Sequence, residues 1–258
     1  FPFMPENNHY LGWTTKEMSK GFDVLRDVMV AGLKPAVARL YDYEDGQLQF
    51  SHMANPDEVT IIFTTEGNAG VARATADGIR EIIARHPDCK PIDGDLVDTW
   101  FNDLVWGPEK VIAESNRIRE SRNVNRTTEV SADWTSIQKI YAAVIPRIRA
   151  EIAGITMVGG HSSHSYINGT NLYFNYFFDL GDTAPENETE ECYLPIISII
   201  VDETLRYGGS IVHHHGMGKA RAPWVKDEYG TSYPMLEKLK QVYDPNGVMN
   251  MGTIIPNK

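Results

Sequence analysis

The spacing of apolar residues predicts four amphipathic helices along the chain. In each of them apolar side chains recur every three or four positions, which places them on one face of a helix. The predicted helices cover residues 21–31, 69–85, 133–152 and 192–207. Asp133 is a candidate N-cap of the third helix, Pro146 is expected to kink it, and Gly208-Gly209 ends the fourth.

Short β-branched or aromatic runs between these helices predict strands. The predicted strands cover residues 36–41, 59–64, 90–92 and 127–130, with two extended pieces within 155–179 on either side of the turn-favouring pair Asn168-Gly169. Residues 1–13 show no period, and the mixed stretch 94–122 is expected to hold one helix. This alternation favours an α+β fold with helices on one face of a mostly antiparallel sheet.

Composition and charge limit the classes of function. The chain has 258 residues, of which 42% are hydrophobic, and its most apolar segment, Leu194–Val201, is too short to cross a bilayer. No signal pattern is present at the N-terminus, so we expect a cytoplasmic protein. A net charge of −11 argues against a nucleic-acid partner, but one well-placed arginine suffices for an anionic substrate. Cys89 and Cys192 have no metal-ligand spacing.

The segment Ser210–Lys219, SIVHHHGMGK, is the first that composition does not explain. Its imidazoles can exchange protons near neutral pH, and Gly216 and Gly218 indicate a tight turn. Three consecutive histidines of an extended segment point in alternating directions, so a three-histidine metal site from this run alone has poor geometry. The alternatives are an exposed polar loop and a histidine-rich metalloprotein, which would hold stoichiometric zinc or manganese.

The order of motifs in the last third of the chain resembles that of a known family. A helix that ends in Gly-Gly is followed by Ser210–Gly218 and then by Tyr243–Gly252, YDPNGVMNMG. This is similar to the C-terminal part of FAD-linked oxidases of the vanillyl-alcohol-oxidase superfamily. Its triple histidine resembles the alkyldihydroxyacetonephosphate synthases, whereas the D-lactate, glycolate and D-2-hydroxyglutarate dehydrogenases carry a metal-binding glutamate where His214 stands.

Two further segments extend the resemblance to the synthases. Lys34–Asp42 is similar to a segment whose arginine binds substrate, which implies that role for Arg39, and Leu172–Phe177 places an active-site tyrosine on Tyr173. Ile118-Arg119-Glu120 resembles a phosphate-contacting segment and implies Arg119, although Arg117 or Arg122 fits equally well. From the residues alone, an ion pair of Arg39 with Asp42 and a core-packing role for Tyr173 are the simpler interpretations.

The resemblance implies the role of the whole chain. Residues 1–258 would be the cap or substrate-binding domain, with ferredoxin-like elements, of a longer protein whose N-terminal FAD-binding domain is absent. Catalytic roles would belong to Tyr173, His213, His214 and His215, substrate binding to Arg39, Arg119 and His164, and contact with FAD to His215 and Asn250. No metal is expected, because Tyr173 replaces the second histidine of the dehydrogenases' His-x6-His pair and no glutamate stands at His214.

Three functions remain open at this point. The first is an FAD-dependent oxidoreductase, or a synthase-like transferase, that acts on an anionic hydroxylated or ketone substrate and needs its FAD-binding domain or subunit. The second is an FAD-dependent D-2-hydroxy acid dehydrogenase. The third is a flavin-free anion-binding module or a truncated product. Apolar surface left uncovered by the absent domain would favour self-association into a homo-oligomer.

Overall fold

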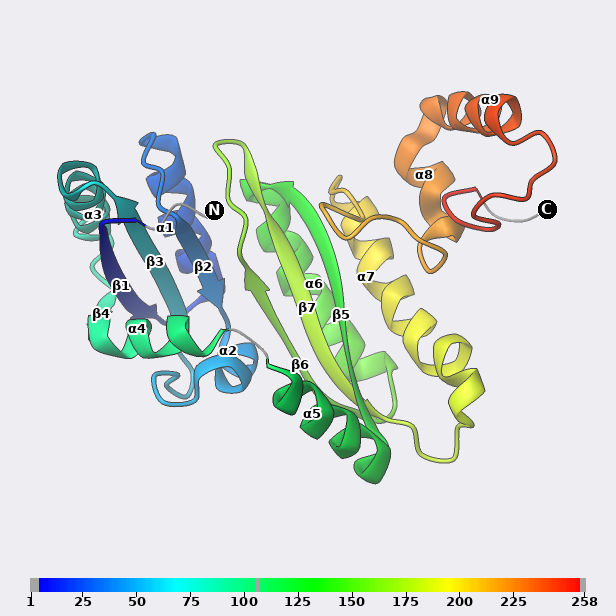
Figure 1. Cartoon of the computed structure of the whole chain (residues 1–258), viewed down its shortest axis with the longest axis horizontal. Helices are drawn as coiled ribbons and strands as arrows, with labels where there is room; N and C mark the ends of the chain where they lie inside the picture. Colours follow the sequence, from blue (N-terminus) through cyan, green and yellow to red (C-terminus); the bar gives the residue numbers. More distant parts are fainter. Residues whose placement is uncertain (1–4, 105–106, 256–258) are drawn as a thin grey trace.

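One antiparallel sheet organises the chain (Figure 1). The computed structural model describes residues 5–104 and 107–255, and within them seven strands pair in the order β4-β1-β3-β2-β6-β7-β5. In sequence order the strands are β1 (Asn7–Thr15), β2 (Val37–Tyr41), β3 (Val59–Gly67), β4 (Lys90–Ile92), β5 (Asn123–Asp133), β6 (Ile155–Ser162) and β7 (Gly169–Asp179). All strand pairs are antiparallel, which confirms the predicted α+β class.

Three helices cover one face of this sheet, as their apolar periodicity requires. These helices are α1 (Met18–Val30), α3 (Ala69–Ile83) and α6 (Trp134–Glu151), and α7 (Leu194–Arg206) packs against α6 and β5. The inner faces of the helices and the sheet form the main core, in which Phe22, Ile137 and Phe174 are fully buried. Burial of such side chains contributes about 1.5–3 kcal/mol each.

Helices also cover part of the second face. There α2 (Tyr43–Phe50) and α4 (Gly94–Asp103) form a smaller core with Tyr41 and Ile62, whereas α5 (Pro108–Ser121) contacts β5. The predicted arrangement, with helices on one face only, did not include this second layer. The sequence indicates the layer through β3, which lacks alternation: residues 59–65 are all buried because helices cover the strand on both faces of the sheet.

Several predicted elements differ from the structure at their boundaries. The stretch 1–13, predicted without a period, contains most of β1, and its residues 1–4 lie outside the described part. The strand lacks alternation because every residue from Leu11 to Thr15 is buried. Residues 94–122 form two helices, α4 and α5, instead of one. The helix cap is confirmed, since Asp133 accepts hydrogen bonds from the backbone N–H groups of Thr135 and Ser136.

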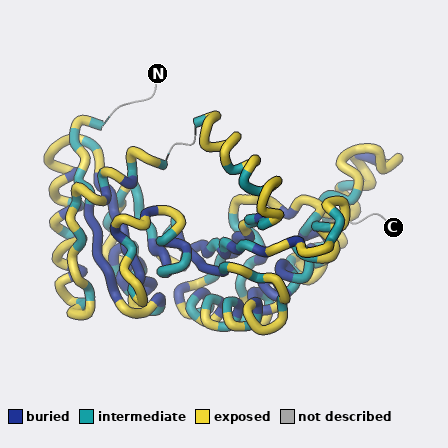
Figure 2. The backbone as a smooth tube through the Cα atoms, turned by 90° about the horizontal axis from the view of Figure 1, so that it is seen from below, coloured by how far each residue is buried: buried dark blue, intermediate teal, exposed yellow. Residues whose placement is uncertain are grey.

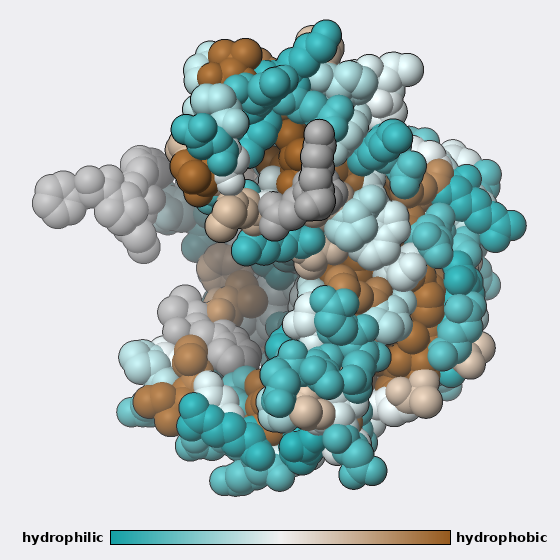
Figure 3. Space-filling view, turned by 90° about the vertical axis from the view of Figure 1, so that its right-hand side faces the viewer, coloured by the Kyte–Doolittle hydropathy of each residue, from teal (hydrophilic) through white to brown (hydrophobic). Residues whose placement is uncertain are grey.

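The C-terminal part lies beside the sheet as a separate group of short helices (Figure 1). It contains α8 (Val225–Tyr229) and α9 (Tyr233–Tyr243), and α8 is attached to α7 through a small apolar cluster around Ile211. Several of its apolar side chains are exposed, among them Val242 and Met249. Figure 3, which views this end, shows hydrophobic patches between hydrophilic ones. No described helix has the length and apolarity needed to cross a membrane.

Asp42 connects the two halves of the sheet. The pairing between β2 and β6 is short, with only Leu40↔Ser162 and Tyr41↔His161 in register. The buried Asp42 carboxylate adds to it by accepting hydrogen bonds from Gly160 N (2.6 Å), from the Tyr141 hydroxyl of α6 (2.8 Å) and from Asp45 N (2.9 Å). The last bond makes Asp42 the N-cap of α2.

We expect Asp42→Ala to lower the free energy of unfolding by about 3 kcal/mol, because it removes a helix cap and leaves the buried Gly160 N–H without a partner. Asp133→Ala is the matched control, since Asp133 caps α6 at an exposed position, and it should cost about 1 kcal/mol. Urea unfolding followed by circular dichroism measures both. An equal loss in the two variants would contradict the connecting role of Asp42.

Candidate active site

A row of four side chains crosses the sheet on the face opposite α1, α3 and α6. The strand register places Glu129 of β5 opposite Tyr173 of β7, Tyr173 opposite His161 of β6, and His161 opposite Tyr41 of β2. The three rings stack, with centroids 4.4 Å apart for His161 and Tyr173 and 4.8 Å apart for Tyr41 and His161. Side chains on neighbouring strands are in contact at this spacing, so the row has a defined geometry.

The histidine segment lies on this row because it pairs with β5. Ser210 and Ser131 exchange two backbone hydrogen bonds, which directs the following residues over Glu129. The Glu129 carboxylate, fully buried, accepts hydrogen bonds from the backbone N–H groups of His213 (3.0 Å) and His214 (3.3 Å). Its Oε1 also lies 3.1 Å from His213 Nδ1 and 2.9 Å from His214 Nδ1.

These contacts determine the charge of Glu129. Burial alone would raise the pKa of its carboxyl group, but the two backbone N–H groups and the neighbouring His214 outweigh burial and lower the pKa. The carboxylate is therefore ionised at neutral pH. It supplies a fixed negative charge behind the rings of His213 and His214.

Tyrosine hydroxyls contact the outer nitrogens of the same two rings. Tyr173 Oη lies 2.8 Å from His214 Nε2, and Tyr166 Oη lies 2.9 Å from His213 Nε2. His215 stands edge-on to Tyr173, with ring centroids 5.2 Å apart, and His164 is 4.6 Å from His214. The structure therefore brings together Tyr173, His164 and all three consecutive histidines, as the sequence predicted.

Burial sets the protonation states of several groups in this cluster. It raises the pKa of Tyr173, so the hydroxyl keeps its proton at neutral pH. Burial lowers the pKa values of His164 and His215, and for His164 the charges of His214, His213 and Arg39 add to this effect. Those two rings are neutral hydrogen-bonding groups near pH 7.

Arg39 reaches the same face from β2. Its Nη1 donates to the Tyr41 hydroxyl (2.6 Å), and its guanidinium lies over the Trp100 ring, 5.5 Å from the centroid. The simpler interpretation, an ion pair with Asp42, is wrong because the Asp42 carboxylate is occupied by Gly160, Tyr141 and Asp45. Within the described residues no carboxylate pairs with Arg39, which leaves guanidinium donors for an anion.

Asp45 and Asn175 belong to the site but were not predicted. The fully buried Asp45 lies 2.5 Å from His161 Nδ1 and accepts two hydrogen bonds of 2.9 Å from the Asn175 amide. It fixes the ring that stacks on Tyr173. Asp45 is separated from His161 by 116 positions in the sequence, and it lies in a short helix without a predicted counterpart, so no local pattern could identify it.

Two predicted residues lie elsewhere. Arg119 is exposed on α5, and of its two alternatives Arg117 lies over the Phe177 ring while Arg122 donates to the carbonyls of Gly181 and Thr183. Asn250 is exposed in the C-terminal loop, and in residues 107–255 no hydrogen bond joins it to the histidines. The predicted roles of Arg119 and Asn250 stay predictions.

The cluster contains one set of atoms that could hold a metal ion. A Glu129 oxygen and one ring nitrogen from each of His213 and His214 lie within 4.8 Å of one another. In this structure these groups bond to one another instead, and tyrosine hydroxyls occupy the outer nitrogens. The sequence expectation of no metal therefore stays a prediction.

The fit of a flavin to this chain is limited to the ring system. Gly67-Asn68-Ala69-Gly70 lacks the spacing of a dinucleotide-binding segment, and here Asn68 is the N-cap of α3. His214 and His215 present exposed rings on an open face, beside the half-buried Tyr173. These groups fit contact with the reacting end of a substrate or cofactor, whereas the pyrophosphate would need another domain.

Comparisons with known proteins identify the family of this chain. The family of FAD linked oxidases, C-terminal domain, matches residues 4–254. The chain is 50% identical to the uncharacterized FAD-linked oxidoreductase YgcU of Escherichia coli K12, covering 99% of this chain and 53% of the relative. It is 23% identical to alkyldihydroxyacetonephosphate synthase of Trypanosoma brucei brucei, covering 98% of this chain and 44% of the relative.

A solved structure shows the same fold. Alkyldihydroxyacetonephosphate synthase superposes with a TM-score of 0.63 and 18% identity, over 100% of this chain and 45% of the other. The chain thus spans about half the length of the relatives it matches.

We expect the purified full-length protein to contain far less than one zinc or manganese ion per chain, and to keep its activity after dialysis against EDTA. The reason is that Glu129, His213 and His214 are already saturated by hydrogen bonds to one another and to Tyr173 and Tyr166. Elemental analysis by plasma mass spectrometry measures the metal. A stoichiometric ion that disappears in His214→Ala would show a metalloprotein instead.

Proposed function

The chain belongs to the family of FAD linked oxidases, C-terminal domain, and we propose that it completes the active site of an FAD-dependent oxidoreductase that oxidises an anionic, hydroxylated substrate. The observation that carries the proposal is the connected series Tyr173–His214–Glu129 on an open face of the sheet. It joins a neutral hydroxyl, an imidazole and a buried carboxylate, which are the groups that proton transfer requires.

The chain's residues would move the proton of the reaction. FAD, when bound, would supply the two-electron oxidation of the substrate. Tyr173 would hydrogen-bond the substrate oxygen, and its contact to His214 Nε2 gives the leaving proton an acceptor 2.8 Å away. Glu129 would stabilise the resulting imidazolium, because its ionised carboxylate lies 2.9 Å from the opposite ring nitrogen of His214.

Arg39 would hold the negatively charged group of the substrate. It lies on the Trp100 ring and donates one hydrogen bond to Tyr41, which orients the guanidinium before a ligand arrives. The positive charge of Arg39 acts to lower the pKa of both Tyr173 and His164, which supports placing the anion and the reacting oxygen in one site. A carboxylate or phosphate can accept two parallel N–H bonds from such a group.

We expect flavin absorption bands in the full-length protein after incubation with FAD, and none in this chain alone. The physical reason is that this chain offers contacts to the flavin ring but no glycine-rich segment for the pyrophosphate. A visible spectrum after gel filtration measures both samples. Absence of flavin from both would favour a flavin-free anion-binding module.

We expect Tyr173→Phe in the full-length protein to lower kcat by about 10²-fold or more, with flavin content unchanged, because the proton loses its path to His214. Tyr229→Phe, at an exposed position of α8, is the matched control and should leave kcat unchanged. Anaerobic stopped-flow reduction of the flavin measures the step directly. A rate for Tyr173→Phe within twofold of the unsubstituted protein would rule out the proposed role.

A further inference from the structure

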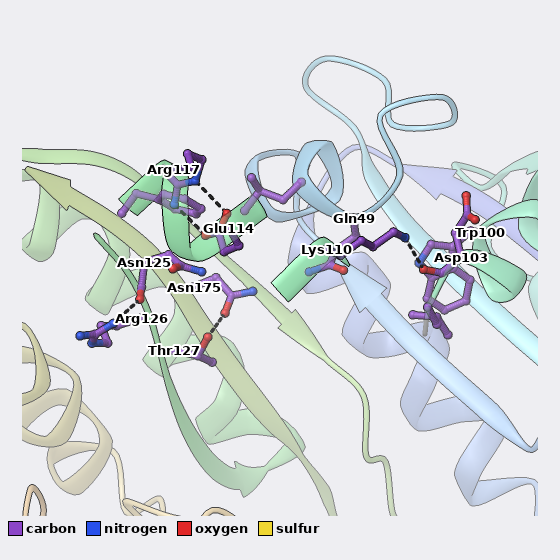
Figure 4. A pocket seen from close by; sticks show the side chains of 13 residues that line it. Gln49, Trp100, Asp103, Lys110, Glu114, Arg117, Asn125, Arg126, Thr127 and Asn175 are labelled. Atoms are coloured by element: carbon purple, nitrogen blue, oxygen red, sulfur yellow. Dashed lines mark hydrogen bonds and ion pairs between the residues drawn. The ribbon is translucent and has the colours of Figure 1, made fainter. Parts of the chain in front are cut away.

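A cavity of about 610 Å³ opens beside the candidate active site, between α5 and the sheet. Figure 2 shows α5 standing off the strands, and Figure 4 shows the side chains that line the space. Asn125 and Asn175 come from β5 and β7, whereas Gln49, Trp100 and Lys110 come from α2, α4 and α5. None of the catalytic residues proposed above lies in its wall.

The cavity adjoins the candidate active site along β7 and at Trp100. Tyr173, Asn175 and Phe177 share one face of β7, so the cavity wall begins about 7 Å from Tyr173 and extends to about 13 Å. Trp100 contacts both sites, since the Arg39 guanidinium lies over its ring and its side chain also lines the cavity. A molecule anchored at Arg39 and reacting at Tyr173 would extend into this space.

Several polar groups in the wall have unused bonding capacity. Within the described residues, the side-chain amides of Asn125 and Gln49 make no hydrogen bond, and the buried Trp100 Nε1 has no partner. Lys110 Nζ makes one weak contact, to the Asp103 carbonyl at 3.3 Å, which leaves other N–H groups available. The unpaired Trp100 Nε1 costs free energy because it is buried, whereas the exposed Gln49 and Lys110 can exchange hydrogen bonds to water for bonds to a ligand.

The charge of the wall argues against a long alkyl chain. Arg117 is neutralised by Glu114 through two bonds of 2.7 and 2.8 Å, so Lys110 is left as a cation with only a backbone acceptor among the described residues. An alkyl chain would remove water from these groups without replacing their hydrogen bonds, at a cost for each group. Hydroxyl groups would replace those bonds, and the flat rings of Trp100 and Phe177 would pack against C–H groups.

We infer that this cavity is a subsite for the distal, polyhydroxylated part of the substrate, which makes the substrate a sugar acid; the inference rests on the proposed function. The acid group binds Arg39, the hydroxyl to be oxidised lies at Tyr173, and the remaining hydroxyls bond to Asn125, Gln49 and Lys110. The wall thus sets specificity without touching the reacting atoms.

The test uses the full-length flavoprotein and three anions: D-gluconate, which is polyhydroxylated, glycolate, which is short, and hexanoate, which is apolar. Anaerobic calorimetric titration measures the dissociation constants. We expect gluconate to bind at least about tenfold more tightly than either other anion, since one or two hydrogen bonds correspond to about that factor. Asn125→Leu should raise the dissociation constant of gluconate about tenfold and leave that of glycolate unchanged.

Asn116→Leu is the matched control, because it makes the same change on the exposed side of α5 and should leave all three constants unchanged. The inference is overturned if hexanoate binds more tightly than gluconate, or if Asn125→Leu leaves the gluconate constant within twofold. Arg39→Gln separates this result from the proposed function: it should weaken glycolate and gluconate alike, and an unchanged glycolate constant would contradict the anion site itself.

Discussion

The fully buried carboxylate of Glu129 joins the histidine segment to the sheet, and the arrangement of the site depends on this one group. Two backbone N–H groups and two imidazole rings converge on it. A buried charge is tolerated only when such partners are present. In return it fixes the positions of His213 and His214, whose outer nitrogens then meet the hydroxyls of Tyr166 and Tyr173.

Buried aspartate side chains also join separate segments at the centre of the sheet. The two halves of the sheet pair through a short contact between β2 and β6, where Asp42 and Asp45 add side-chain hydrogen bonds to Gly160, His161 and Asn175. These bonds hold β6 and β7 beside β2. The stacked row of Tyr41, His161 and Tyr173 follows from that alignment, so stability and site geometry depend on the same residues.

The chain spans about half the length of its relatives, and the side chains grouped at the candidate site lie on one open face of its sheet. The proposed proton path, the proposed anion site and the adjoining cavity all lie on the face that α1, α3 and α6 leave free. The chain orients these groups, whereas the redox chemistry would come from a cofactor that another part of the protein holds. In this proposal, substrate recognition belongs to the chain described here.

The sequence by itself determined most elements and half of the site. Helical periodicity located α1, α3, α6 and α7, Asp133 marked a cap, and the order of motifs around His213–His215 and Tyr173 identified the family, because these signals are local. Tertiary structure alone decided that Glu129, Asp45 and Asn175 support those residues, that Arg39 is free of Asp42, and that Arg119 lies outside. The reason is physical: strand register and backbone pairing such as Ser131↔Ser210 join positions far apart in the chain, and no local pattern encodes that.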